Sequence, residues 1–288
     1  MNIQTFSVVV GGMGCNARCP FCVSKMTQNQ NVKSHTWTDI NQTRLQVAIR
    51  LAERCGCTTA MLTGKGEPTL HPEQINGYIP ILSQRFPIIE LQTNGILLPQ
   101  MEADLENWKI YGLTSVCISA VHWRRIRNRE IYSERYQDLE RATKMLQSAG
   151  LSVRWNITML KGYVDSVEKV HRLISYAEEA GVEQLTIRPV RRPMYTAEDA
   201  KSCIVHRWVL EHEIPKWKLI QIRGSLVTSG VKVLDLPFGA EVYDIGGQNV
   251  TIADCLTGGD TTEQMRNLIF FPDGGLFHRW DLKGARIL

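Results

Sequence analysis

Six short apolar segments alternate with amphipathic segments between Thr5 and Val190. The apolar segments have the length and composition of strands, and they are Phe6–Val10, Thr59–Thr63, Ile88–Asn94, Ser115–Val121, Val153–Leu160 and Gln184–Val190. Strand–helix repeats of this kind pair into a parallel sheet through right-handed crossovers. Six repeats are fewer than the eight that close a complete barrel. The pattern therefore predicts an α/β fold, a partial and open (β/α)6 TIM-like barrel.

The amphipathic segments carry the signals of helices. Before Gly56, four apolar residues recur at helical spacing, namely Leu45, Ala48, Ile49 and Ala52. A later helix is predicted from about Tyr136 to Ala149, with Gly150 after it. Another opens with Asp165-Ser-Val-Glu168, a variant of the capping box, and ends before Gly181.

Polar and apolar residues alternate within the third, fifth and sixth predicted strands. The polar members of this alternation are Glu90, Gln92, Asn94, Arg154, Asn156, Thr158, Gln184, Thr186 and Arg188. Strands that are buried on both faces read instead as continuous apolar runs. The alternation predicts helices on the outside of the sheet and a polar inner face. Half-exposed antiparallel strands would produce the same alternation, and that alternative stays open.

The residues after the last repeat have a different character. We expect a barrel domain over residues 1–192 and a C-terminal extension over residues 193–288. In the extension, Ala197–Ile214 has a helical pattern, and Gly230–Leu234, Val250–Ala253 and Leu268–Phe271 are β-like. Pro272-Asp-Gly-Gly275 then predicts a hairpin turn. The extension is therefore expected to be a helix plus a small β-rich cap over the open barrel.

Composition and charge argue against several classes of protein. Hydrophobic residues at 43% and charged residues at 22% are ordinary for a globular protein, and no apolar run approaches the length of a membrane span. The N-terminus has no basic region of a secretory signal, so we expect a cytoplasmic protein with no membrane partner. A formal charge of +4 is too mild to indicate a nucleic-acid partner. Arginines do gather in two short stretches, residues 124–129 and 188–192.

Three cysteines, Cys15, Cys19 and Cys22, lie within eight residues directly after the first predicted strand. A loop of this length can place three sulfurs around one face of an iron–sulfur cluster. Such a cluster normally takes four cysteine ligands, and no fourth cysteine is nearby, so one iron would be open to a small molecule. A structural zinc site completed by His35 is the alternative. The remaining cysteines, apart from Cys117, show no ligand spacing and are interpreted as structural.

This C-x3-C-x2-C motif, with Phe21 just before its last cysteine, closely resembles the signature of the radical S-adenosylmethionine (SAM) enzymes. The resemblance covers roughly residues 6–192. It implies a [4Fe–4S] cluster on Cys15, Cys19 and Cys22, with SAM bound at the open iron. It also implies reductive cleavage of SAM to a 5′-deoxyadenosyl radical that abstracts hydrogen from a substrate. An electron donor such as flavodoxin or ferredoxin would be the protein partner.

Further segments at the carboxyl ends of the predicted strands resemble SAM-binding motifs of the family. Gly66, Glu67 and Pro68 align with a Gly-Gly-Glu-Pro segment that holds the amino group of SAM, although Lys65 departs from it. The stretch Leu91-Gln92-Thr93-Asn94-Gly95 resembles the family's Thr-Asn-Gly segment. Gln92 and Asn94 share its polar face and would contact the methionyl part of SAM or the substrate. Ser119 would reach the ribose, and Phe21 would shield the cluster and present its backbone to the adenine. Simple Gly/Pro and Asn-Gly turns are the alternatives for the first two segments.

The resemblance also points to substrate contacts on the later strands. Asn156 and Arg188 match positions that line the pocket in relatives. A guanidinium on an inner face needs an acidic partner, so Arg188 should meet either Glu90 or an anionic ligand. Cys117 is either a hydrogen-atom donor or a buried small residue.

These features predict an enzyme that acts on a small anionic substrate, such as a nucleotide, a nucleotide-sugar or a phosphorylated intermediate. Modification of a ribosomally made peptide is the alternative reaction. A zinc-binding or iron–sulfur-binding interaction module is the alternative outside the enzymes. The predicted turn at Pro272–Gly275 is not followed by paired cysteines, which argues against a second cluster, although Cys255 leaves an unusual one open.

Overall fold

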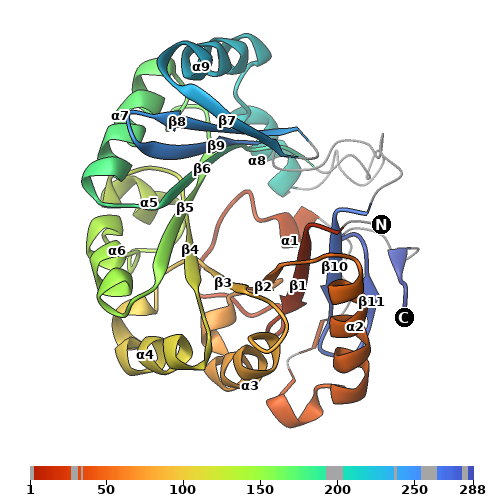
Figure 1. The fold of residues 1–288 in the computed structure, drawn as a ribbon. Coiled ribbons are helices and arrows are strands. Elements are labelled where there is room, and N and C mark those ends of the chain that lie inside the picture. The colour runs from red at the N-terminus through yellow and green to blue at the C-terminus, as the bar shows by residue number, and fades with distance from the viewer. Residues whose placement is uncertain are drawn as a thin grey trace.

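A computed structural model describes residues 3–26, 32–33, 35–192, 204–236, 239–253, 265–280 and 285–288. Its described strands form one sheet in the order β11-β10-β1-β2-β3-β4-β5-β6-β9-β8-β7. The six central strands are β1 Thr5–Val9, β2 Thr59–Thr63, β3 Ile88–Thr93, β4 Ser115–Ala120, β5 Ser152–Met159 and β6 Gln184–Pro189. Neighbouring members of this set pair in parallel. The sheet curves into an open wall with helices on its outside (Figure 1). The predicted partial TIM-like barrel is thus confirmed.

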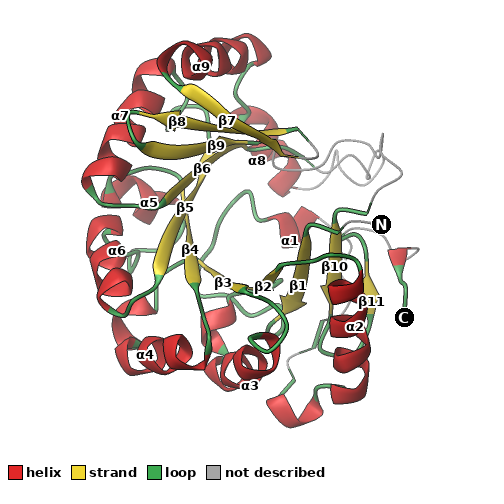
Figure 2. Cartoon of the chain, in the orientation of Figure 1, coloured by secondary structure: helices red, strands yellow, loops and turns green. Residues whose placement is uncertain are grey.

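The helices follow the strands in chain order (Figure 2). They are α1 Val23–Met26, α2 Gln42–Arg54, α3 Pro72–Leu82, α4 Glu102–Tyr111, α5 Arg125–Ile131, α6 Leu139–Ser148, α7 Val167–Glu179, α8 Ile204–His212 and α9 Lys216–Ser229. Side chains cap three of the long helices, since Asn41, Asp138 and Ser166 accept hydrogen bonds from the first turns of α2, α6 and α7. The cap at Asp138 explains why α6 begins three residues after the predicted Tyr136.

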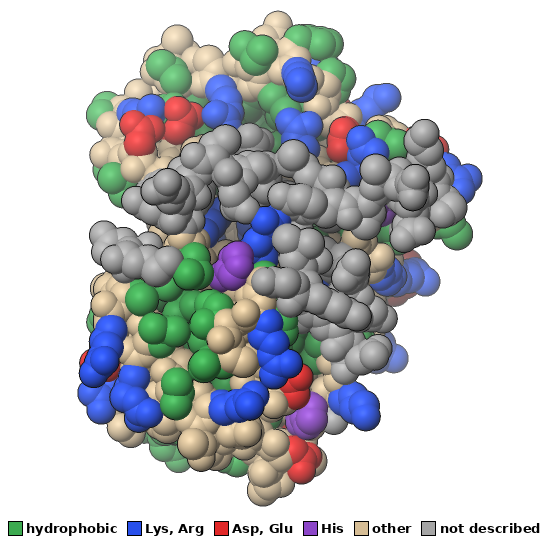
Figure 3. Space-filling model, turned by 90° about the vertical axis from the view of Figure 1, so that its right-hand side faces the viewer, with side chains coloured by type: hydrophobic (Ala, Val, Ile, Leu, Met, Phe, Trp, Pro, Cys, Tyr) green, Lys and Arg blue, Asp and Glu red, His purple; other side chains and the backbone are tan. Residues whose placement is uncertain are grey.

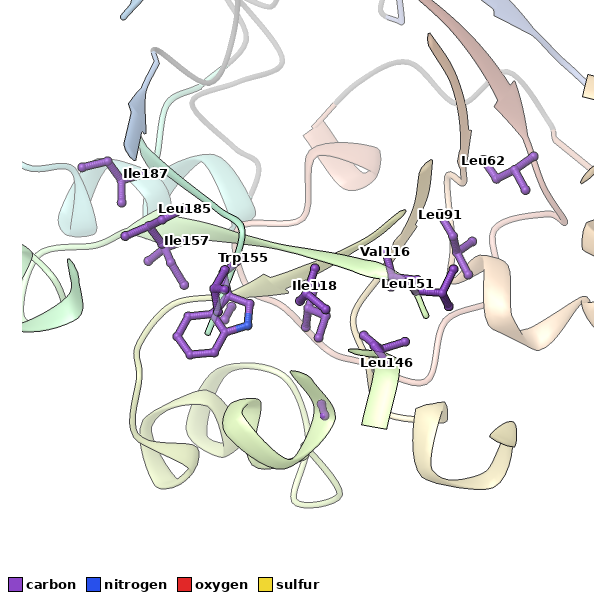
Figure 4. Close-up of a cluster of buried hydrophobic side chains, with 14 of the residues drawn as sticks. Leu62, Leu91, Val116, Ile118, Leu146, Leu151, Trp155, Ile157, Leu185 and Ile187 are labelled. Carbon is purple, nitrogen blue, oxygen red and sulfur yellow. The ribbon is translucent and has the colours of Figure 1, made fainter. Parts of the chain in front are cut away.

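The outer face of the central strands is apolar and packs beneath the helices. Figure 4 shows these side chains on successive strands, with Leu62, Leu91, Ile118, Ile157 and Ile187 among them. Each of these five is at most 1% exposed. The polar members of the alternation therefore lie on the opposite, inner face. Because the strands are parallel, the antiparallel alternative for this alternation is wrong.

The C-terminal strands extend both edges of the same sheet. At one edge, β9 Gln248–Ile252 pairs in parallel with β6, and β8 Ala240–Ile245 and β7 Val231–Leu236 follow in antiparallel order. At the other edge, β10 Asn267–Phe270 pairs in parallel with β1 and antiparallel with β11 Leu276–Phe277. The predicted hairpin turn at residues 272–275 joins β10 to β11, with Gly274 at a φ of 85°.

Two C-terminal elements were not predicted from the sequence, and one was predicted longer than it is described. Helix α9 buries Leu219 and Ile222 but exposes Trp217 and Ile220, so its apolar residues mark no single face. Strand β8 was also missed. The predicted helix Ala197–Ile214 is described only as α8, because residues 193–203 lie outside the described residues. The boundary at residue 192 stays a prediction.

Across the described residues, we find no helix with the length and apolar character that crossing a bilayer demands.

We expect Leu91→Ala to lower the free energy of unfolding by about 3 kcal/mol, because Leu91 is fully buried between β3 and the outer helices. Urea denaturation followed by circular dichroism measures the change. Ile110→Ala is the matched control, since Ile110 on α4 is 78% exposed and its truncation should cost less than about 0.5 kcal/mol. Equal losses in the two variants would contradict this packing.

Candidate functional site

The cysteine loop leaves the carboxyl end of β1 and is held there by tight contacts between two glycine-bearing loops. The backbone N–H of Glu67 donates to the carbonyl of Gly14 over 2.9 Å. A Cβ atom added to Gly66 would stand 1.9 Å from that same carbonyl oxygen, so only glycine fits. A Cβ atom added to Gly11, which has a φ of 68°, would stand 2.1 Å from the ring of His71. These contacts place the cysteine loop beside the loop that follows β2.

The three predicted ligand thiols lie on one loop and affect one another electrostatically. Cys15 is exposed, while Cys19 and Cys22 are half-buried. Burial, and after it the charges of Cys22 and Cys15, raises the pKa of Cys19 to about 12. Bound metal would offset this cost, since its positive charge favours thiolates. The donor set therefore fits a group that binds all three sulfurs.

The described residues include His35 and all three of these cysteines, and among them no three His, Cys, Asp or Glu side chains converge on a site for one metal ion. The structure thus gives no support to a zinc site built from the three cysteines and His35. Ligands of a cluster stand further apart than those of one ion, because the cluster is larger. The lack of a site for one ion therefore does not count against a cluster on the three thiols.

Glu67 is a buried carboxylate that joins the ends of β2 and β3. Its Oε1 accepts hydrogen bonds from the N–H and the hydroxyl of Thr69, and from the hydroxyl of Thr93 at 2.6 Å. Its Oε2 accepts one, from the N–H of Asn94 at 2.9 Å. Burial raises the pKa of Glu67, and these four donors oppose that shift. The carboxylate thus has a structural role, and Oε2 keeps the capacity for a further donor.

Asn94 brings the end of β3 to the cysteine loop. Its Nδ2 donates to Asn16 Oδ1 at 2.7 Å and lies 3.8 Å from Cys15 Sγ. Gln92, two residues earlier, lies deeper on the same face and donates to Glu90 at 3.1 Å. The structure therefore brings Asn94 to Cys15 and places Gln92 in a polar layer nearer the amino ends of the strands.

The inner face carries a buried ion pair at its lower level, that is, nearer the amino ends of the strands. Both Nε and Nη2 of Arg154 donate to the carboxylate of Glu90, with Nε at 2.8 Å. Glu90 was one of the two partners considered for Arg188, and that pairing is wrong because Arg154 occupies the carboxylate. Arg188 instead donates from Nε to Asn156 Oδ1 at 2.8 Å. Within the described part of the chain, Arg188 makes no ion pair.

A second guanidinium lies near Arg188. Burial, followed by the positive charge of Arg188, lowers the pKa of Arg266, which directly precedes β10. Arg154 and Arg266 were both missed as site residues. Arg154 belonged to the alternating pattern, but no sequence signal points to Arg266, which is far from β6 in the chain.

Cys117 and Ser119 lie on the inner face of β4. Cys117 is buried, in register with Gln92 and Arg154 on the flanking strands, and burial raises its thiol pKa to about 11. Ser119 is half-buried and in register with Asn156. Its backbone carbonyl accepts a hydrogen bond from Tyr136 at 2.7 Å. The structure therefore places Ser119 at the level of Asn156, above Cys117.

Aromatic contacts pack against the cysteine loop, and Lys65 joins the loop after β2 to the C-terminal segment. The ring of Phe21 packs 6.2 Å from that of Tyr132 and 6.0 Å from that of Trp208 on α8. Pro68 is buried and begins a short 3₁₀ turn after Glu67. Lys65, the departure from the family motif, donates to the carbonyl of Trp280 at 3.4 Å. This contact spans 215 positions, so no local pattern could have revealed it.

Comparison with known proteins agrees with this geometry. The profile of the radical SAM superfamily matches residues 9–174. The 7-carboxy-7-deazaguanine synthase of Hyperthermus butylicus is 32% identical over 113 residues, which cover 38% of this chain and 43% of that protein. The match thus spans less than half the length of this curated relative.

Two solved structures share the fold. SuiB of Streptococcus suis bound to S-adenosylmethionine gives a TM-score of 0.56 at 14% identity, over 96% of this chain and 60% of that one. A radical SAM methyltransferase from Sphaerobacter thermophilus gives a TM-score of 0.56 at 16% identity, over 86% of this chain and 66% of that one. At these identities the likeness shows the fold alone.

We expect Glu67→Ala to lower the free energy of unfolding of the cluster-free protein by roughly 3 kcal/mol, because it leaves buried N–H and hydroxyl donors without an acceptor. Urea denaturation measures the loss. Glu73→Ala is the control, since the side chain of Glu73 is 51% exposed. If Glu67→Ala proved as stable as the wild type, the structural role of this carboxylate would be refuted.

Proposed function

The chain belongs to the radical SAM superfamily, and from this membership we propose that it cleaves SAM reductively to abstract hydrogen from a small anionic biosynthetic substrate. A nucleotide, a nucleotide-sugar or a phosphorylated intermediate would have the required charge. The observation that carries the proposal is the position of Arg188. It lies on the inner face, held by Asn156 and near Arg266, and makes no ion pair with a described residue.

Cys15, Cys19 and Cys22 would hold a [4Fe–4S] cluster, in keeping with the fit of their thiols. When bound, the cluster and SAM together supply a 5′-deoxyadenosyl radical. The chain's own residues bind and orient SAM. Oε2 of Glu67 has room for an ammonium donor, and the buried contacts of Gly66 and Pro68 keep that carboxylate in place.

The remaining SAM contacts are assigned by their positions in the site. Asn94 lies beside Cys15 and would bind the methionyl part of SAM, while Gln92 completes the polar layer beneath it. Ser119 would contact the ribose. Phe21, packed between Tyr132 and Trp208, would shield the cluster and turn its backbone toward the adenine.

Asn156 and Arg188 would bind the anionic group of the substrate. A partly buried guanidinium is costly without a counter-charge, and the proximity of Arg266 increases that cost. A phosphate or carboxylate bound at Arg188 would supply that counter-charge. The name of the Hyperthermus butylicus relative describes a carboxylated product, which is in keeping with an anionic substrate class.

Cys117 is proposed as a hydrogen-atom donor to a substrate radical. Burial keeps its thiol protonated at neutral pH, which is the form that carries the hydrogen. The alternative is a structural residue that fills the space beside the Glu90–Arg154 pair.

A second candidate is modification of a ribosomally made peptide. SuiB has also been solved bound to the precursor peptide SuiA, and this structure matches the fold with a TM-score of 0.55. The polar inner face favours the small anion, because Arg188 lies there without an ion pair to a described residue. A metal-binding interaction module, the alternative from another class, would not cleave SAM.

We expect Cys19→Ala to abolish both the brown chromophore and SAM cleavage, because it removes one of three ligands for which the loop has no substitute. Anaerobic reconstitution with iron and sulfide, followed by chromatography of 5′-deoxyadenosine, measures both. Cys55→Ala is the control, since Cys55 follows α2 away from the cysteine loop, and it should keep both properties. A Cys19→Ala protein that still cleaved SAM would refute the cluster assignment.

We expect Arg188→Leu to reduce binding of the anionic substrate roughly 10- to 100-fold, since a charge-assisted hydrogen bond contributes about 1.5–3 kcal/mol. Cleavage of SAM without turnover of the substrate should persist, because Arg188 lies on β6, away from the cysteines. A panel of nucleotides and sugar phosphates, tested by calorimetry, identifies the ligand to compare. Arg192→Leu is the control, since Arg192 pairs peripherally with Glu213. Undiminished turnover in Arg188→Leu would show that the anion binds elsewhere.

A further inference from the structure

Helix α5 and its flanking loops carry arginines for which the proposed chemistry has no use. Arg124 and Arg125 at its start and Arg135 after its end are all exposed. Ile126 lies among them and is 59% exposed. An exposed apolar side chain with arginines around it is typical of the centre and rim of a protein interface.

This basic segment adjoins the cysteine loop. The backbone N–H of Arg18, between the first two cysteines, donates to the carbonyl of Tyr132 at the end of α5 over 2.9 Å. The Arg18 side chain is 73% exposed and stands 4.0 Å from Glu134. A partner that covered α5 would therefore also cover the outer side of the cysteine loop.

Positive charge on this surface exceeds the acidic charge that could neutralise it. Arg127 is neutralised by Glu130 at 2.6 Å. Arg124, Arg125 and Arg135 make no ion pair within the described part of the chain. Burial, and after it the positive charges of Arg127 and Arg124, lowers the pKa of the neighbouring His122 to about 4.

The surface is also hollowed at one end. Arg124 and Arg125 line a cavity of about 470 Å³, and Arg172 of α7 completes its basic lining. Two carboxylates, Asp138 and Glu179, share the lining, but Asp138 is engaged as the cap of α6. Arg172 pairs with Glu168 at 3.5 Å, whereas Arg124 and Arg125 make no ion pair with a described residue. These two guanidinium groups at the cavity suit a protruding acidic side chain.

We propose that the surface formed by Arg18, Arg124, Arg125, Ile126 and Arg135 is the docking site of an acidic one-electron carrier protein. The proposal rests on the proposed function. Cleavage of the sulfonium C–S bond of SAM to methionine and a 5′-deoxyadenosyl radical consumes one electron, and the carrier is oxidised by one electron in exchange. Complementary charge accelerates such encounters and makes them sensitive to salt.

The test uses reduced flavodoxin and a reduced [2Fe–2S] ferredoxin as probes. The variant is Arg124→Glu combined with Arg135→Glu, because neither side chain makes a hydrogen bond or an ion pair with a described residue that the fold would lose. The matched control is Arg50→Glu with Arg54→Glu on α2, where both side chains are exposed. That helix lies on the side of the molecule shown in Figure 3, across the barrel from α5 (Figure 1).

Calorimetry at low and high salt measures binding of the carrier to cluster-free and cluster-loaded protein. We expect the variant to weaken binding of at least one carrier tenfold or more and to lower carrier-driven SAM cleavage in parallel. Dithionite-driven cleavage, which needs no docking, should be the same in the wild type, the variant and the control.

Three results would overturn the docking site. These are carrier binding that the variant does not weaken, an equal loss in the α2 control, and no salt-sensitive binding of either carrier to the wild type. Salt-sensitive binding of transfer RNA that only the α5 variant loses would assign the surface to nucleic acid instead. Failure of the wild type to cleave SAM with dithionite would refute the proposed function, while the calorimetry would still decide the docking site.

Discussion

The hydrogen bond from the N–H of Glu67 to the carbonyl of Gly14 is the contact on which the candidate site depends. It requires two backbones to approach so closely that a single Cβ at Gly66 would collide with Gly14. The same residue then uses its carboxylate to hold Thr93 and Asn94. Through one residue, the ends of β1, β2 and β3 are fixed relative to one another, and with them the cysteine loop.

Charge on the inner face is divided between two levels. The lower level is neutral overall, because Arg154 and Glu90 satisfy each other and Gln92 donates to the same carboxylate. The upper level, at Arg188 and Asn156, has hydrogen bonding without an acidic partner among the described residues. Buried charge that the fold itself neutralises stabilises structure, whereas buried charge left over calls for a ligand. This difference separates a structural polar layer from a binding one.

The C-terminal residues contribute to both sides of the barrel opening. Strand β9 extends the sheet beyond β6, and β10 extends it beyond β1. They also bring Trp280 to Lys65 in the loop after β2, and Arg266 near Arg188. The part of the chain with the weakest family resemblance thus supplies residues beside the strongest motifs, where differences between relatives in substrate choice can arise.

The sequence by itself determined the strand–helix order, the inward-facing polar residues and the three cysteines, because each is written in local spacing. Period-two alternation alone is enough to place Glu90, Gln92, Arg154 and Asn156 on one face of the sheet. Only the tertiary structure decided which of them pair. Arg154 rather than Arg188 takes Glu90, because strand register and sheet curvature set the distances between side chains on different strands. The hydrogen bond from Lys65 to Trp280 and the placement of Arg266 near Arg188 bring together residues that are far apart in the chain, and local periodicity carries no information about such distances.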